Sequence, residues 1–361
     1  MFIEKISLIN FRNILQLNIA PSEGLNIICG KNAQGKTNFL EAIYFCATGR
    51  THRSNKDKDL INFEYNAAIA KLDIDNYISK NNIKVEISNL KKRIYVNNFQ
   101  IKRLGDLYGM LYAVVFSPED LQLVKLGPGL RRRFIDMELC QIYPVYYQNL
   151  RLYYKTLKQK NNLLKGSSVK RADTELFDVF DQQLYEYGKS IYKYRSNYIN
   201  KLNNISKKIV NDITEQKEDM QILYKPNVNI VDLLEKLKKY REKDIVRGST
   251  SVGIHIDDME FKINLKNAKE FASQGQQRTA ALAVKLATVE LIKQEKAQSP
   301  VVLLDDVFSE LDYSRQEYLL KSIIDTQVFI TLTGAESSLN VVKNGPDVRF
   351  YRVEGGAFFE D

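Results

Sequence analysis

The segment GKNAQGKT, residues 30–37, matches the phosphate-binding pattern G-x-x-x-x-G-K-[ST] at every fixed position. It follows the apolar run LNIICG and precedes TNFLEAIYF, so we expect a strand before it and a helix after it. In such a loop the glycines turn backbone N–H groups toward phosphate oxygens, the lysine reaches the β- and γ-phosphates, and the threonine hydroxyl binds Mg²⁺. The pattern predicts an ATP site, with Thr37 as a metal ligand, built from Gly30, Lys31, Asn32, Ala33, Gln34, Gly35, Lys36 and Thr37.

Two adjacent carboxylates end the apolar run VVLLDD, residues 301–306. Ligands of α/β sheets bind at the carboxyl ends of the strands, which is where this pattern places both side chains. Asp305 is predicted to hold Mg²⁺ through water, and Asp306 to position or deprotonate the water that attacks ATP. Aspartate is also common in capped turns after strands, but the P-loop upstream favours the catalytic interpretation.

The segment SQGQQRT, residues 273–279, precedes a long run rich in Ala and Leu. Ser273 is a good N-cap, so helix capping alone accounts for a serine at this position. The N–H groups at a helix start also attract anions. A P-loop, then Ser-x-Gly-Gln, then an Asp pair is the motif order of ABC-type ATPases, where the Ser-x-Gly-Gln turn binds the γ-phosphate of ATP held by a second subunit. This resemblance implies that role for Ser273, Gly275 and Gln276, and implies that Asp312 of SELD lies in a D-loop at the same dimer interface.

The net charge of +9 is concentrated in one internal segment. Residues 121–248 contain 25 Lys and Arg against 15 Asp and Glu, and they also hold 12 of the 21 tyrosines. Basic charge beside aromatic rings suits a polyanion such as DNA. A solvated helical surface with tyrosines in its core fits the composition equally well.

Composition also limits the compartment and the cofactors. No segment approaches the roughly 20 apolar residues that a bilayer-crossing helix needs, so no membrane partner is expected. The N-terminus lacks a signal-peptide pattern. Three scattered cysteines and two histidines predict neither a disulfide framework nor a zinc site. We therefore expect a reduced, cytoplasmic protein.

Periodicity predicts strands at both ends of the chain and helices in the middle. Alternating apolar residues predict three strands within the first 30 residues, and an antiparallel meander in AAIAKLDID, NIKVEISN and RIYVNNFQI. VVLLDD and QVFITLT are short apolar runs typical of buried parallel strands. Another strand is expected in GIHIDDMEFKINL. Helical spacing occupies 36–47, 146–164, 175–223, 233–243 and 276–296.

These elements predict an α/β fold interrupted by a mostly helical arm, and the resemblance in motif order implies an ABC-type P-loop ATPase head with a mixed sheet and an antiparallel meander. We expect the N-terminal part of the ATPase domain at 1–120, the basic arm at 121–248 and the C-terminal part of the ATPase domain at 249–361. At 361 residues the chain can build a core for each of the two domains.

Two further groups of residues have open alternatives. Arg12 and Asn13 lie between the first two predicted strands, where related ATPase heads contact the nucleotide; an ordinary charged turn is the alternative. Arg131, Arg132 and Arg133 follow a structured Gly-Pro-Gly turn, which favours contact with DNA phosphates; a solvated helix start is the alternative.

Within the ABC class the chain resembles the RecF family of bacterial recombination-repair ATPases over essentially its whole length. The similarity is carried by FSPEDLQLVKLGPGLRRRFIDM at 116–137, LLDDVFSELDYSRQEYL at 303–319, TGRTHR at 48–53 and SQGQQRT at 273–279. The chain departs from the family at 253–258, where GIHIDD replaces G-P-H-R-D-D, so that Ile254 and Ile256 stand for a proline and an arginine.

The resemblance implies an ATP-dependent DNA-binding protein that forms a homodimer on ATP and hydrolyses it slowly, with Mg²⁺ and DNA stimulation. It implies action at gapped DNA and single-strand/double-strand junctions, recombinase loading with the RecO and RecR proteins, replication restart and SOS induction. Two other classes fit less well. A transporter ATPase subunit would not carry about 235 residues with a basic helical insert between the P-loop and Ser273, and a coiled-coil chromosome protein would need several hundred heptad residues.

Overall fold

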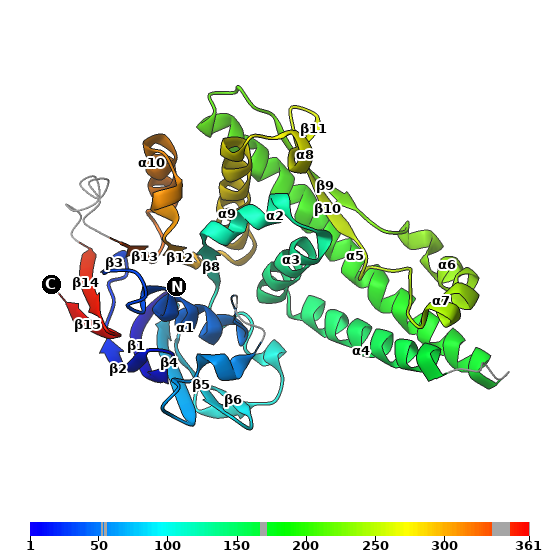
Figure 1. The fold of residues 1–361 in the computed structure, drawn as a ribbon, viewed down its shortest axis with the longest axis horizontal. Helices are drawn as coiled ribbons and strands as arrows, with labels where there is room; N and C mark the ends of the chain where they lie inside the picture. Colours follow the sequence, from blue (N-terminus) through cyan, green and yellow to red (C-terminus); the bar gives the residue numbers. More distant parts are fainter. Residues whose placement is uncertain (52, 54–55, 167–171, 334–346, 361) are drawn as a thin grey trace.

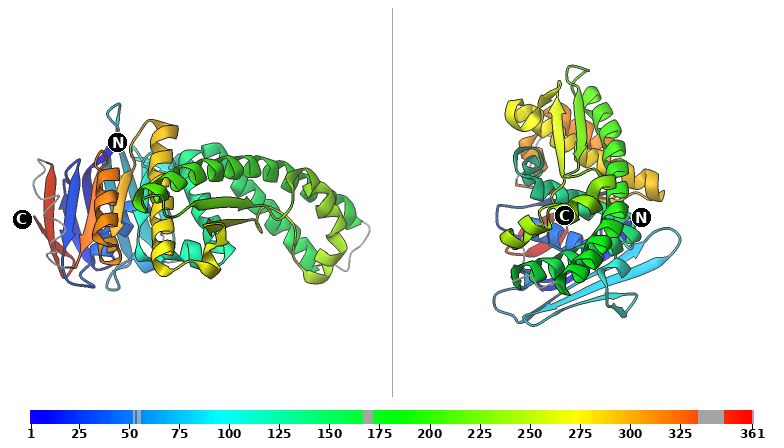
Figure 2. Two further views of the ribbon diagram at one scale, coloured as in Figure 1. Left: turned by 90° about the horizontal axis from the view of Figure 1, so that it is seen from above. Right: turned by 90° about the vertical axis from the view of Figure 1, so that its right-hand side faces the viewer.

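The structure is a computed structural model that describes residues 1–51, 53, 56–166, 172–333 and 347–360. Two sheets with their covering helices form one lobe, which holds both termini, and a helical arm projects from it (Figure 1). Seen from above, the two long arm helices extend well beyond the sheets (Figure 2). The predicted fold class, a P-loop ATPase head with an inserted helical arm, is confirmed.

The central sheet has the strand order β15-β14-β3-β13-β12-β8 and is parallel except at β15. Its strands are β3 (Leu25–Cys29), β8 (Ala113–Phe116), β12 (Val301–Asp305), β13 (Val328–Leu332), β14 (Val348–Glu354) and β15 (Ala357–Glu360). Every residue of β8, β12 and β13 is buried, as expected of strands covered on both faces. The carboxyl ends of β3, β13, β12 and β8 therefore share one edge of the sheet, the edge that carries the P-loop.

The second sheet is antiparallel, with the order β2-β1-β4-β5-β6-β7. It contains β1 (Phe2–Phe11), β2 (Ile14–Ile19), β4 (Ala67–Asp75), β5 (Lys80–Ser88), β6 (Lys92–Val96) and β7 (Phe99–Ile101). The predicted meander is present, but the run 93–101 forms two strands. Asn97 and Asn98 both have positive φ, 51° and 66°, which is the backbone of a tight two-residue hairpin turn.

Helices and short 3₁₀ turns link and cover these sheets. They are α1 (Lys36–Thr48), η1 (Asp57–Leu60), η2 (Leu104–Asp106), η3 (Pro118–Leu121), α2 (Gln122–Lys125), α9 (Gln274–Lys296), η5 (Val307–Glu310) and α10 (Tyr313–Ser322). Nearly all of α1 is buried, because it packs against strands of both sheets. The P-loop helix is thereby held in the centre of the lobe.

The arm combines helices with a small sheet of order β11-β10-β9. Its elements are α3 (Pro128–Ile142), α4 (Pro144–Gly166), α5 (Ala172–Ile213), β9 (Met220–Lys225), η4 (Ile230–Asp232), α6 (Leu233–Lys239), α7 (Arg241–Arg247), β10 (Asp258–Ile263), β11 (Lys266–Asn267) and α8 (Ala268–Phe271). The predicted helix 175–223 is too long, since residues 220–223 belong to β9. Because β9 pairs with β10, the predicted boundary at 249 falls inside this arm.

A buried arginine joins the parts of the arm. The guanidinium of Arg195, 1% exposed, donates to Asp136 at 2.8 Å, to the carbonyl oxygen of Ile254 at 2.7 Å and to Asp257 at 3.4 Å. A charge removed from water in this way is stable only when its donors are fully used. Because residue 254 contributes its carbonyl group, the isoleucine that departs from the family pattern leaves this bond intact.

No helix within the described residues has the length and apolar character needed to cross a membrane.

Candidate ATP-binding site

The P-loop connects β3 to α1, as the sequence predicts. Gly35 has φ 114°, and a Cβ atom there would lie 2.8 Å from the side-chain oxygen of Asn13. That asparagine oxygen also accepts a hydrogen bond from Asn38 of α1 at 2.8 Å. Asn13 therefore lies against the P-loop, beside the predicted nucleotide, and Gly35 is required by both backbone geometry and space.

The side chain of Lys36 is folded into the loop. Its Nζ donates to the carbonyl oxygens of Gly30 at 2.6 Å and Lys31 at 3.0 Å, and the residue is 5% exposed. Burial lowers the pKa of this ammonium group, while the nearby carboxylates of Asp306 and Asp305 act to raise it. No carboxylate of the described residues forms an ion pair with Lys36, so an anion in the loop would supply the missing counter-charge.

The two predicted metal ligands meet. Thr37 Oγ1 donates to Asp305 Oδ1 at 2.8 Å, and Thr331 of β13 donates to the same oxygen at 3.0 Å. Burial raises the pKa of Asp305, and these two hydrogen bonds oppose that rise. A hydroxyl and a carboxylate at the end of a parallel sheet are the hard oxygen donors that Mg²⁺ prefers, directly or through water, so the residues present fit this ion.

Asp306, the predicted catalytic carboxylate, has a left-handed backbone with φ 53° and ψ 23°. Its N–H group donates to Thr331 Oγ1 at 3.0 Å, which stabilises this conformation. Such a backbone is unusual outside glycine and is found at functional sites. Local sequence patterns did not assign Thr331 to the site; its position opposite Asp305 in the parallel register between β12 and β13 is the signal that would have found it.

Arg12, predicted to contact the nucleotide, is engaged with a buried carboxylate. Its Nε and one Nη donate to Glu41 of α1 at 2.6 and 3.1 Å, and Glu41 also accepts from the Thr51 hydroxyl at 2.6 Å. Glu41 is fully buried, so this pair fixes the β1–β2 turn onto the P-loop helix. The structure thus gives Arg12 a positioning role, and its contact with the nucleotide stays a prediction.

The β14–β15 hairpin contacts the P-loop, which the sequence analysis did not foresee. The N–H group of Gly356 donates to the carbonyl oxygen of Gln34 at 3.0 Å, and Gly355 donates to the Gln34 side chain. A Cβ atom at Gly356 would lie 2.1 Å from the carbonyl oxygen of Asn13, so only glycine fits. Gly-Gly between two short runs rich in valine and phenylalanine was the available signal for this turn.

The Ser-x-Gly-Gln segment begins α9 in a capping box. Ser273 Oγ accepts from the N–H of Gln276 at 3.2 Å, and the Gln276 side chain accepts from the N–H of Ser273 at 2.9 Å. Ser273 and Gly275 are exposed. A Cβ atom at Gly275 would meet nothing nearer than Ser273 Oγ at 3.9 Å. The fold of a single chain therefore does not require glycine here, although glycine costs a helix about 1 kcal/mol relative to alanine.

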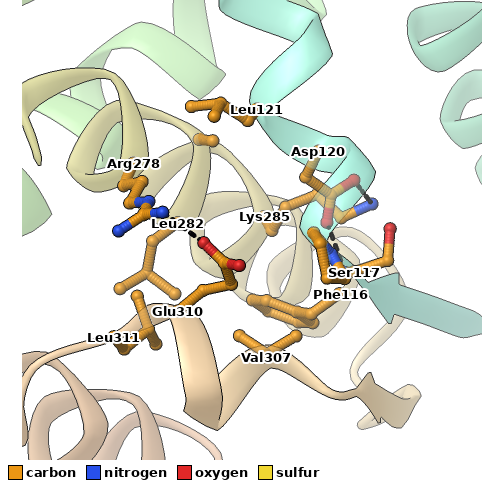
Figure 3. Close-up of a pocket in the computed structure, with 12 residues that line it drawn as sticks. Phe116, Ser117, Asp120, Leu121, Arg278, Leu282, Lys285, Val307, Glu310 and Leu311 are labelled. Carbon is orange, nitrogen blue, oxygen red and sulfur yellow. Dashed lines mark hydrogen bonds and ion pairs between the residues drawn. The ribbon is translucent and has the colours of Figure 1, made fainter. Parts of the chain in front are cut away.

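The predicted D-loop residue Asp312 caps α10, accepting from the N–H of Arg315 at 3.0 Å. The Arg315 guanidinium contacts both Asp312 and the Thr279 hydroxyl of α9, so the predicted D-loop and the predicted signature helix are joined within one chain. An ion pair between Arg278 and Glu310 makes a second tie. Figure 3 shows this pair beside a small pocket between α9, η5 and the end of β8.

The arginine triplet requires a correction. Arg131 is buried, and its guanidinium donates to both carboxylate oxygens of Asp258 at 2.7 and 2.8 Å and to the carbonyl oxygens of Leu126 and Leu123. Arg132 donates to the carbonyl oxygen of Asp257. The interpretation of Arg131 as a DNA contact is therefore wrong, because its donors are committed inside the arm.

Arg133 is the exposed member of the triplet, and it donates to the carbonyl oxygen of Thr51 at 3.0 Å. This bond joins α3 to the segment after α1, so Arg133 connects the arm to the ATPase lobe. His52, which belongs to the TGRTHR run, lies outside the described residues.

A P-loop at the centre of a parallel sheet, an Asp pair on the neighbouring β12, an antiparallel second sheet and a signature helix at the base of an inserted arm define an ABC-type ATPase head of the SMC class. The family model for the RecF/RecN/SMC N-terminal domain matches residues 2–351. Solved Smc head domains share the fold, with a TM-score of 0.59 at 16% identity over 100% of this chain and 97% of theirs.

Within that class the chain belongs to the RecF family. It is 42% identical to the DNA replication and repair protein RecF of Acetivibrio thermocellus, over 99% of each chain. A solved structure described as the recombination mediator protein RecF with ATP, in the RecFOR pathway, matches with a TM-score of 0.91 at 33% identity, covering 100% of this chain and 97% of that one.

Proposed function

We propose that this protein binds ATP and Mg²⁺ in the P-loop site and uses them to control its binding to DNA during recombinational repair and replication restart. The observation that carries the proposal is the hydrogen bond between Thr37 and Asp305, which brings the two predicted metal ligands together from opposite ends of the chain. A solved RecF structure with ATP, from a relative of 33% identity and nearly equal length, supports ATP as the nucleotide that this protein binds.

Each residue of the site has a part in the proposed reaction. Backbone N–H groups of the P-loop and the ammonium of Lys36 bind the phosphates, while Thr37 and Asp305 hold the metal ion. An Mg²⁺ ion held by Thr37 and Asp305 would supply positive charge that offsets the negative charge of the phosphates. Asp306, fixed by Thr331, orients or deprotonates the attacking water.

We further propose that ATP joins two copies of the chain, with Ser273, Gly275 and Gln276 of one copy facing the ATP of the other. Gly275 supports this arrangement. It leaves open space at an exposed helix start, and the fold of the single chain does not require a glycine there. Asp312 would lie at the same interface, tied to the signature helix through Arg315 and Thr279.

The proposed partners follow from the family. We propose that the protein acts in the cytoplasm at gapped DNA and duplex/single-strand junctions, together with the RecR and RecO proteins, to assist recombinase loading and SOS induction. Slow, DNA-stimulated hydrolysis would serve as a switch between dimer and monomer.

The test uses the purified protein and three measurements: ATP hydrolysis with Mg²⁺ or with a chelator, sedimentation with and without ATP, and affinity for gapped duplex DNA in the same conditions. We expect hydrolysis only with Mg²⁺, faster turnover with DNA, and a dimer only with ATP. A protein that remains monomeric with ATP and binds DNA equally with and without it would contradict the proposal.

A further inference from the structure

The outward face of α4 carries a straight row of basic side chains. Arg151, Lys155, Lys158 and Lys165 are exposed, and the exposed amide of Asn162 lies between the last two. The steps along the chain are four, three, four and three residues, which keep all five side chains within about 40° on either side of one line along the helix. We call these five residues the α4 ridge. It is about 21 Å long at 1.5 Å per residue.

The opposite face of α4 is the buried one, which fixes the orientation of the ridge. Tyr153, Leu157 and Leu164 pack inward, and Lys160 on the same side forms a fully buried ion pair with Asp181 of α5 at 2.6 Å. Lys160 is therefore the lysine of α4 that has a structural partner, and it does not belong to the ridge. Among the described residues, no carboxylate forms an ion pair with a ridge side chain.

The charge pattern of α4 differs from that of a solvated helix face. Exposed helices usually carry both acidic and basic residues, and the neighbouring α5 carries both, whereas residues 144–166 contain no Asp or Glu. Arg151 and Lys155 are four apart and Lys155 and Lys158 three apart, so they repel one another and weaken the isolated helix. An interaction with the helix dipole explains Lys165, at the carboxyl end, but not the others.

We propose that the α4 ridge is the surface on which the arm holds duplex DNA, by contact with the phosphate backbone. This inference rests on the proposed DNA-binding function and replaces the arginine triplet as the DNA surface of the arm. Over about 21 Å a duplex presents about six phosphates on each strand, so four long cationic side chains in a straight row can each meet a phosphate. Contacts of this kind position the duplex without reading its sequence.

The experiment compares two variants with equal loss of charge. The first changes the four charged ridge residues to glutamine (R151Q, K155Q, K158Q and K165Q). The control changes four exposed basic residues of the ATPase lobe (K58Q, K91Q, K102Q and R103Q). The probe is a fluorescent duplex of about 30 base pairs, with a single-stranded oligonucleotide of equal length as a second probe, and anisotropy gives the affinity over a salt series.

We expect the ridge variant to bind duplex at least about tenfold more weakly near 100 mM salt, and its slope of log affinity against log salt to be shallower by up to about 3.6. The control variant should stay within about twofold of the wild type at the same salt. Both should keep the wild-type melting temperature, because the substituted side chains are exposed.

The outcomes separate this inference from the proposed function. Wild-type protein that binds no DNA overturns both. If the wild type binds DNA and the ridge variant binds it with the same affinity, only the assignment of the ridge is overturned. An equal loss of affinity in the control variant also overturns that assignment, because it would show a general effect of charge. A ridge variant that loses only the single-stranded probe also overturns it, because the proposed ligand is the duplex.

Discussion

Thr37 and Asp305 are 268 positions apart in the chain, and their side chains form a 2.8 Å hydrogen bond. Thr37 lies in the first turn of the P-loop helix and Asp305 ends β12, two elements that the parallel sheet brings to the same edge. The bond links the two halves of the predicted metal site. Because the two side chains are hydrogen-bonded, we expect a substitution of either one to impair the same metal site.

Asp305→Asn should reduce Mg²⁺-dependent ATP hydrolysis by about 10- to 100-fold, the usual effect of losing a residue that holds a metal through water. The amide keeps the shape of the side chain but not its charge. Steady-state hydrolysis over a range of Mg²⁺ concentrations measures the effect. Asp325→Asn, an exposed carboxylate paired with Lys293, is the control. A native rate with an unaltered Mg²⁺ dependence in D305N would remove Asp305 from the site.

Lys36→Ala should abolish ATP hydrolysis and ATP-dependent dimerisation, because Lys36 is the buried cation of the P-loop. Lys31→Ala is a matched control from the same loop. The side chain of Lys31 is exposed, and its backbone carbonyl, which contacts Lys36, remains in the variant. Nucleotide binding by calorimetry and mass by sedimentation should separate the two variants. If K36A hydrolyses ATP at the native rate, the assignment is wrong.

Ser273→Arg should leave ATP binding near normal while preventing dimerisation and hydrolysis. The new side chain would fill the space where the partner's γ-phosphate must arrive, while the P-loop of the same chain is untouched. Ser273→Ala is the milder comparison, since it removes only the cap, at about 1 kcal/mol of stability.

Mixing S273R with K36A sharpens this test. In the mixed dimer one composite site carries both changes and the other pairs an intact P-loop with an intact signature. Partial recovery of hydrolysis would support the arrangement between two chains. Dimerisation of S273R on ATP at wild-type concentrations would falsify it and leave Ser273 as a helix cap.

His255 should make the arm sensitive to acid. Its ring lies between the Tyr153 hydroxyl and the carbonyl oxygen of Thr250, and burial lowers its pKa to about 4. In the unfolded chain the pKa of a histidine is about 6.5, so between pH 6.5 and pH 4 the unfolded chain binds more protons than the folded one. The stabilising contribution of the neutral ring is therefore fully present above pH 6.5, and it is lost as the pH falls toward 4. The loss should approach ~3 kcal/mol.

Denaturant unfolding at several pH values, compared between wild type and His255→Gln, measures this contribution. The slope between pH 6.5 and 4 should be smaller in the variant, even if its stability at neutral pH is lower. An imidazole pKa near 6.5, measured by NMR in the folded protein, would contradict the prediction.

Arg131→Ala should lower the free energy of unfolding by ~2 kcal/mol. This is less than the loss expected on breaking a fully buried ion pair, because Asp258 is partly exposed. Arg133→Ala should change stability by no more than about 0.5 kcal/mol, since its guanidinium is exposed. Urea unfolding measures both. In a double-mutant cycle, Asp258→Ala should recover part of the loss in R131A, and strictly additive losses would show that the pair contributes nothing.

Local patterns predicted the elements of the ATP site, because the P-loop, the Asp pair and the capping box are each contained in a few consecutive residues. They could not predict partners supplied by distant segments. Arg131 was assigned to DNA because its charge is visible in the sequence, whereas Asp258, which neutralises it, lies 127 residues away. Thr331 was missed for the same reason, since only the register of two parallel strands places it beside Asp305.

The error in the helix 175–223 has another cause. Residues 220–223 contain Met, Ile and Leu at spacings that suit a helix or a strand, and pairing with β10 decides between them. The α4 ridge shows the reverse case: its five positions and the lack of acidic residues were visible in the sequence, but their exposure required the structure.

The strand that carries the P-loop is synthesised before both of its neighbours in the sheet, which follow it in the chain after a long interval. β3 lies between β13 and β14, and both pair with it from Leu25 to Cys29. A nascent chain therefore has the nucleotide-binding sequence but no neighbouring strand beside β3 until β13 has left the ribosome. A product truncated before residue 328 would lack both neighbours of β3, so it could not compete with the full-length protein for ATP or form mixed dimers with it.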